Sequence, residues 1–377
     1  MSKPRSIFEE VGDAGPRPER AAPRTGPRYP RGAIAAWLKG LFLLVVAMIV
    51  VGGLTRLTGS GLSITEWAPV TGALPPLNET AWEAAFARYR ETPQFQDLNR
   101  EMTLAEFRTI YWWEWGHRQL GRLTGLVWLG GFAWFALRSK IPPGWTGRLL
   151  GLGVLGGLQA AIGWWMVSSG LEDGMVHVAS YRLAVHLGLA FAILGLIAWY
   201  VLALSRSESE LLQSRRQRSE AMMRWGSVLI GVAFLQVLMG ALVAGIDAGR
   251  SFTDWPLMAG ELFPSGAFEF APAWRNFTEN SALVQFNHRL LGYVLVVLGA
   301  VAWARSRSSA RLEIRRAFDA VVLMLLIQTG LGILTVIHGA PWHVAIVHQL
   351  GAVVLFTLIV RARFAALHPR EQRVARG

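Results

Sequence analysis

The sequence predicts an all-α integral membrane protein with eight transmembrane helices, arranged as a tandem parallel repeat of two four-helix bundles. Hydrophobic residues make up 53% of the 377 residues and charged residues only 16%, whereas soluble domains carry about 25% charged residues. Eight apolar stretches are long enough to cross a bilayer, which takes about 20 residues. The order of motifs along the first four stretches recurs along the last four.

The expected spans lie at residues 34–54, 111–137, 148–168, 179–204, 225–246, 281–304, 319–338 and 342–364. Residues 34–204 would form the first bundle and residues 225–364 the second, with a linker at 205–224 and a tail at 365–377. Residues 1–33, rich in Pro and Arg, are expected to be disordered. Segment 68–110 mixes polar and aromatic residues and predicts amphipathic helix at the membrane surface.

Loop charges predict the orientation of these spans. The tails and loops on one side, counted with Arg361 and Arg363 at the end of the eighth span, hold 25 Lys and Arg against 10 Asp and Glu, and the loops on the other side hold 8 against 14. Basic residues are enriched on the cytoplasmic side, so both termini are expected there. The net charge of +12 is then explained by topology, and we expect no nucleic-acid partner. The absence of cysteine excludes disulfides, thiolate metal sites and a cysteine nucleophile.

Several motifs recur in the same order. Residues 61–67 (Gly-Leu-Ser-Ile-Thr-Glu-Trp) follow the first span, and residues 249–255 (Gly-Arg-Ser-Phe-Thr-Asp-Trp) follow the fifth. The other matches are His117-Arg118 with His288-Arg289, Gln159 with Gln328, Gly163 with Gly332, and His186 with His348. Each half has four spans, so both halves enter the membrane the same way round, as in a parallel repeat about an axis along the membrane normal.

Four histidines lie at matching depths, each six or seven residues past the outer end of an even-numbered span. At 1.5 Å per residue this is about 10 Å into the membrane. They are His117, His186, His288 and His348. Facing imidazoles in a helical bundle can ligate haem iron, so we predict two bis-histidine haem sites.

Two arginines follow the first histidine of each pair. Arg118 and Arg289 could pair with haem propionates, although contact with lipid headgroups is an equal alternative for either residue alone. A di-iron site would need further inward carboxylates, and the second half has Gln285 where the first has Glu114. We therefore favour haem.

Four further histidines are less informative. His177, His338 and His343 lie in or near outer loops, where they could transfer protons, bind propionates or simply be solvated. Solvation is the favoured interpretation. His368, in the basic C-terminal tail, is expected at the surface.

The halves differ at Glu114, which precedes His117 by three residues and shares its helix face. A buried carboxylate can act as a general base or stabilise positive charge on a substrate. It can also merely orient an imidazole. Its counterpart Gln285 cannot ionise, which predicts chemistry in the first half and electron storage or transfer in the second.

This combination of duplicated spans, paired histidines and the Glu-x-x-His-Arg sequence at 114–118 resembles the haem A synthase family over residues 34–364. The resemblance implies a membrane oxidoreductase acting on a CH group. Its reaction is the oxidation of the C8 methyl of haem O to a formyl group by successive hydroxylations, which gives haem A for terminal oxidases. It also implies that His288 and His348 ligate a resident haem b, that His117 and His186 hold substrate haem O, and that Glu114 is the catalytic acid.

The resemblance also implies a location and partners. The chain is similar to the cysteine-free branch typical of proteobacteria and mitochondria, so we expect the bacterial inner membrane and no thiol-based electron delivery. Haem O synthase and an electron acceptor in the membrane are the expected contacts, and a homo-oligomer stays open. Two other classes also remain: a bis-histidine di-haem electron-transfer cytochrome and a haem carrier.

Overall fold

The structure is a computed structural model that describes residues 29–172 and 174–370. The predicted disorder of the N-terminal tail falls mostly outside these residues, although residues 31–33 already belong to the first helix. The described residues are helical, and their β structure is limited to an isolated bridge between Met258 and Glu261.

Eight helices among the described residues are long and apolar enough to cross a membrane, which confirms the predicted number. They are α1 (Arg31–Leu57), α4 (Leu104–Leu137), α5 (Thr146–Ser169), α6 (Ser180–Leu204), α8 (Glu220–Gly245), α10 (Ser281–Ser306), α11 (Leu312–Ile337) and α12 (Trp342–Leu367).

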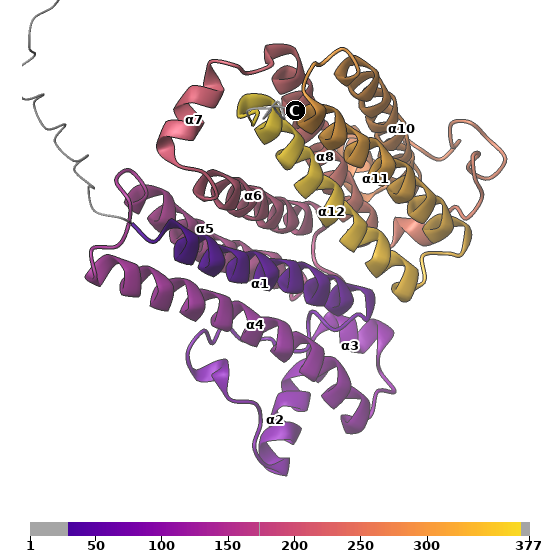
Figure 1. Cartoon of the computed structure of the whole chain (residues 1–377). Coiled ribbons are helices and arrows are strands. Elements are labelled where there is room, and N and C mark those ends of the chain that lie inside the picture. Colours follow the sequence, from indigo (N-terminus) through magenta and orange to yellow (C-terminus); the bar gives the residue numbers. More distant parts are fainter. Residues whose placement is uncertain (1–28, 173, 371–377) are drawn as a thin grey trace, which may run out of the picture.

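The spanning helices form two groups that lie side by side (Figure 1). In the first group α1 packs against α4 and α6, and α5 packs against the same two helices. In the second group α8 packs against α10 and α12, and α11 packs against the same two. The groups meet where α6 contacts α8 and α12 and where α1 contacts α12.

Close packing holds the two groups together. Phe191 of α6 meets Phe356 of α12 edge to face with ring centroids 5.6 Å apart, inside a buried cluster that also includes Leu229 of α8. Lipid tails are as apolar as leucine, so such contacts stabilise helix association through van der Waals packing rather than hydrophobic transfer. Apolar side chains on the outside, such as Leu126 and Val154, remain exposed and suit a lipid environment.

The segment 68–110 contains an amphipathic helix, as expected. Helix α2 (Glu79–Arg90) buries Trp82, Ala85 and Tyr89 on one face, and α3 (Pro93–Leu98) follows it. The buried face packs against the first turns of α4 through Phe107 and Tyr111. Helix α4 starts at Leu104, before the expected residue 111, because its first turns pack against α2. A capping box of Thr103 and Glu106 fixes the start of the helix.

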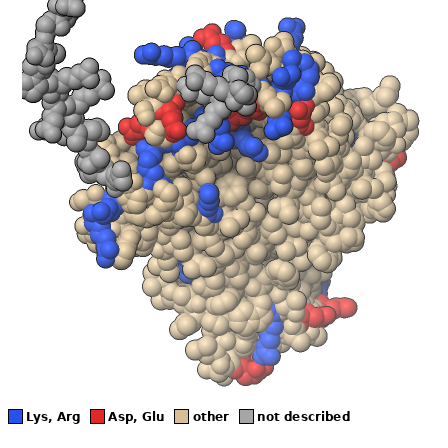
Figure 2. Space-filling model, viewed as in Figure 1, with Lys and Arg blue, Asp and Glu red and all other residues tan. Residues whose placement is uncertain are grey.

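The opposite end of the molecule is basic. Figure 2 shows Lys and Arg gathered near the short helix α7 (Glu208–Arg215) and the end of α12, while the middle of the visible face is almost free of charge. The expectation that His368 lies at the surface was wrong. His368 is only 3% exposed, and its Nδ1 lies 3.0 Å from Ser214 Oγ. Helix α7 folds back over the end of α12 and covers this histidine, which the tail composition could not reveal.

Candidate functional site

Each of the four intramembrane histidines lies against a glycine of a neighbouring helix. A Cβ atom added to Gly52, Gly163, Gly240 or Gly332 would lie 2.9, 2.9, 3.1 or 3.1 Å from a ring atom of His117, His186, His288 or His348, respectively. Real Cβ atoms rarely approach neighbours this closely. Glycine therefore allows each imidazole to sit against the backbone of α1, α5, α8 or α11.

Three of the histidines are also held by a glutamine one turn before that glycine. Gln159, Gln236 and Gln328 each place Nε2 3.2 Å from Nδ1 of their histidine. The same nitrogen donates to the histidine's own carbonyl oxygen at 3.0, 3.0 and 2.8 Å, respectively. The sequence comparison noted Gln159 and Gln328 but missed Gln236, although the Gln-x-x-x-Gly spacing would have found it.

The second group brings its two histidines close together, with the two rings nearly perpendicular. The rings of His288 and His348 have centroids 6.5 Å apart and planes 84° apart. Iron bonded to a nitrogen of each ring at about 2 Å needs ring centroids roughly 6 Å apart. Oε1 of each adjoining glutamine, Gln236 and Gln328, is buried without a partner, and turning the amide over would let it accept the Nδ1 proton of a ligating histidine. These residues fit an axially ligated haem.

The first group is built differently. Within the described residues the rings of His117 and His186 make no comparable ring contact. At Gly52 the added Cβ would meet Nε2 of His117, whereas at the other three glycines it would meet Cε1. The His117 ring is therefore turned differently from the others.

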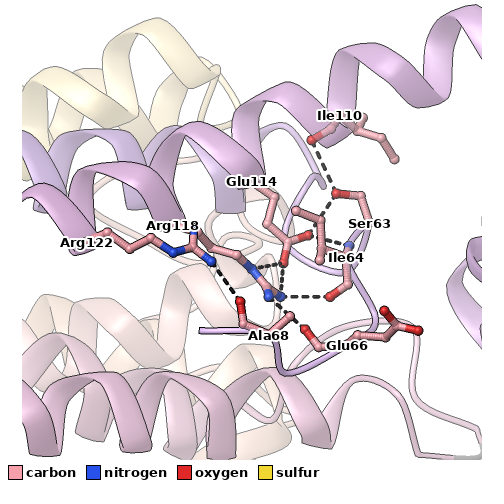
Figure 3. A network of polar contacts seen from close by, with 8 residues as sticks. All are labelled: Ser63, Ile64, Glu66, Ala68, Ile110, Glu114, Arg118 and Arg122. Carbon is pink, nitrogen blue, oxygen red and sulfur yellow. Dashed lines mark hydrogen bonds and ion pairs between the residues drawn. The ribbon is translucent and has the colours of Figure 1, made fainter. Parts of the chain in front are cut away.

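Glu114 is buried at 3% exposure and both of its oxygens are engaged (Figure 3). Oε1 accepts from Arg118 Nε at 3.1 Å and Nη2 at 2.6 Å. Oε2 accepts from the Ser63 hydroxyl at 2.8 Å and the Ile64 backbone N–H at 2.9 Å. The carboxylate thus joins α4 to the loop that carries the first copy of the repeated motif.

The arginine that follows His117 binds the same loop as Glu114 does. Arg118 donates to the carbonyl oxygens of Glu66 at 3.0 Å and Ile64 at 2.7 Å. Arg122, one turn later, donates to Ala68 O at 2.9 Å (Figure 3). The repeated loop motif therefore wraps the arginine-bearing face of α4.

In the second group Arg289 donates to the carbonyl oxygens of Phe252, Asp254 and Leu257 at 2.9–3.0 Å. Gln285 Nε2 also donates to Phe252 O at 3.0 Å. Among the described residues Arg289 has no carboxylate within salt-bridge distance, whereas Arg118 is paired with Glu114. Arg118 therefore forms a direct ion pair with a carboxylate, whereas Arg289 binds carbonyl oxygens.

The acidic residues of the two loops, Glu66 and Asp254, take different roles. The Asp254 carboxylate accepts backbone N–H bonds from Ala259 and Gly260, which hold its pKa below the ordinary value. Glu66 instead pairs with Arg88 of α2 at 3.4 Å. The side chains of both residues therefore stabilise the structure outside the spanning helices.

His177 lies near the end of α1, where a carboxylate after α8 bridges the two groups. Its Nε2 is 3.7 Å from Asp247, whose carboxylate accepts from Arg56 of α1 at 2.8 Å. Burial, followed by the nearby Arg56 charge, lowers the pKa of His177. His338 and His343 are exposed.

Fold and site together define a multi-pass helical membrane protein with partly buried histidines between its spans. Residues 35–360 match the family of cytochrome oxidase assembly proteins, and the chain belongs to that family. It is 59% identical to a protein of Dinoroseobacter shibae named heme A synthase, covering 98% of this chain and 97% of that one. Proteins of the same name from Ruegeria pomeroyi and Paracoccus denitrificans are 57% and 55% identical, each covering 98% of both chains.

Proposed function

We propose that this protein is a haem A synthase, which oxidises the C8 methyl group of haem O to a formyl group. With water as the oxygen donor, each of two hydroxylations replaces a C–H bond by a C–OH bond and releases two protons and two electrons, which the proposed membrane electron acceptor takes up. Loss of water from the doubly hydroxylated carbon then leaves the formyl group. The observation that carries the proposal is the unlike construction of two histidine sites in one chain. One has facing imidazoles 6.5 Å apart, and the other has an ionisable Glu114 beside a differently turned His117.

The second site is proposed to hold a resident haem b through His288 and His348. A bound haem supplies reversible one-electron storage. Gln236 and Gln328 keep both imidazoles in place through bonds to ring and backbone. Arg289, whose charge has no carboxylate partner among the described residues, is the side chain proposed to attract the propionates.

The first site is proposed to hold substrate haem O through His117 and His186. Glu114 lies one turn from His117, buried and bonded to Arg118 and Ser63. There the carboxylate can balance positive charge that develops on the substrate or take up a released proton. Arg118 orients this carboxylate and, in this proposal, also lies near the propionates of haem O.

The proposed setting is the bacterial inner membrane with both termini in the cytoplasm, supported by the 25-to-8 division of basic residues between the two sides. We further propose that residues 34–204 and 225–364 are two copies of one unit related by a parallel repeat. The recurring glycine–histidine contacts support this duplication. Haem O synthase and a membrane electron acceptor are the proposed partners, and self-association is a further option.

Extraction of the bound porphyrins from the purified protein tests the proposal. Haem b together with haem O, its hydroxylated forms or haem A is the expected composition. Haem b alone, after expression in cells that make haem O, would indicate an electron-transfer cytochrome instead. Haem O that is bound and released unchanged would indicate a haem carrier.

A further inference from the structure

The four histidine sites share one construction with a single departure. Three imidazoles have a glutamine four residues before their contact glycine, namely Gln159, Gln236 and Gln328. The same position before Gly52 is Met48. A Cβ on Gly121 would meet Met48 Cε at 3.6 Å, and a Cβ on the corresponding Gly292 would meet Gln236 Nε2 at 3.4 Å. Met48 therefore occupies the place that glutamine takes at the matching site.

This replacement removes two hydrogen bonds. A glutamine amide reaches both the ring and the carbonyl oxygen of its histidine, and at Gln328 these distances are 3.2 and 2.8 Å. A thioether has no N–H to donate. Within the described part of the chain no hydrogen bond reaches the His117 imidazole, which presents Nε2, not Cε1, to its contact glycine. Packing alone holds this ring.

We propose that Met48 leaves His117 free to release and rebind the iron of haem O, so that substrate can enter and product can leave the first site. The proposal rests on the proposed function, since it assigns the exchangeable haem to His117. Met48 is a positioning residue that acts through the imidazole. The glutamine-held His288 and His348 keep their haem, whereas the turned ring of His117 can swing on its side-chain torsions.

The expected change in the rate of haem release follows from the missing hydrogen bonds. One net hydrogen bond changes an equilibrium by about twofold to tenfold. Met48→Gln should therefore slow the loss of haem O by about threefold to tenfold, if glutamine restores the bonds seen at the other sites. The reciprocal Gln236→Met should speed the loss of haem b from the second site by a similar factor. Met48→Leu, which also lacks a donor, should change neither rate.

The experiment loads the purified full-length protein with haem O, removes the excess and adds apomyoglobin to capture released haem. Chromatography of the captured pigment separates haem O from haem b, so the two sites are followed in one sample. The visible spectrum provides a second measurement, because a fixed His117 should raise the fraction of six-coordinate, low-spin haem in Met48→Gln.

Equal haem O release from Met48→Gln and the wild type would overturn the role of Met48 while leaving the proposed function intact. A changed spectrum or faster release in Met48→Leu would show that the sulfur itself binds iron, which also contradicts the proposal. Failure of the wild-type protein to take up haem O at all would instead overturn the proposed function, and this inference with it.

Discussion

Replacement of Glu114 by glutamine should loosen the loop at residues 61–68 from α4. The carboxylate accepts four hydrogen bonds, two from Arg118 and one each from Ser63 and Ile64, at 2.6–3.1 Å. A glutamine offers one acceptor oxygen and turns two N–H groups toward a site filled with donors. The second group accommodates Gln285 differently, since its Nε2 donates to Phe252 O.

The cost can be estimated from burial. Glu114 is 3% exposed, and removing one partner of a buried ion pair costs about 3–5 kcal/mol. Arg118 keeps its bonds to the carbonyl oxygens of Ile64 and Glu66, so the lower end, about 3 kcal/mol, is appropriate. This corresponds to an increase of about a hundredfold in the equilibrium constant for local opening, at 1.36 kcal/mol per factor of ten.

Hydrogen–deuterium exchange of the detergent-purified protein measures this opening. The amide of Ile64, which donates to Glu114 at 2.9 Å, should lose protection by about a hundredfold. The matched control is Gln285→Glu at the corresponding position of the second group, which removes the N–H that binds Phe252 O and should leave the protection of residues 61–68 unchanged. Unchanged protection of residues 61–68 in Glu114→Gln would refute the claim that the carboxylate fixes this loop.

Three further predictions concern topology, haem ligation and pH. Single cysteines at the exposed positions Thr80 and Ser265 should react with an impermeant thiol reagent in spheroplasts, whereas cysteines at Ser139, Ser209 and Ser308 should not; the reverse pattern would invert the topology. His288→Ala or His348→Ala should remove haem b, because bis-histidine iron loses one axial bond, and His117→Ala or His186→Ala should retain most of it. Equal haem b loss from all four would contradict the division of roles. Because the pKa of His177 is lowered in the folded state, its contribution to stability is present above about pH 6.5 and lost as the pH falls through the folded-state pKa. Thermal unfolding should show a weaker pH dependence in His177→Gln, and an unchanged dependence would exclude this histidine as its source.

Hydropathy predicted the eight spans because a membrane imposes long, uniformly apolar helices on the sequence. The motif repeats placed histidines, arginines and Glu114 on the correct helices. They could not reveal what each side chain contacts. Arg118 was interpreted as a partner of propionates or of lipid headgroups, and neither alternative indicates that its guanidinium also binds Glu114 and loop carbonyl oxygens. Such bonds depend on how residues 61–68 fold back onto α4, which sequence spacing does not specify.

The glycines and glutamines around the histidines show a second limit. Gln159 and Gly163 stood out in sequence because Gln328 and Gly332 match them. Their role depends on the packing of α5 against α6, because this contact places Gln159 and Gly163 beside His186. Met48 carries no signal by itself. It is informative only by comparison with three glutamines that each lie at the corresponding position beside their own histidine.

The most direct test of the central claim is haem A production in a bacterial strain that lacks its own haem A synthase but still makes haem O. Expression of the wild-type chain should yield haem A in membrane extracts. Glu114→Gln and His117→Ala should yield little, with haem b still bound to the purified protein. Absence of haem A with the wild-type chain, despite its correct insertion and bound haem b, would contradict the account.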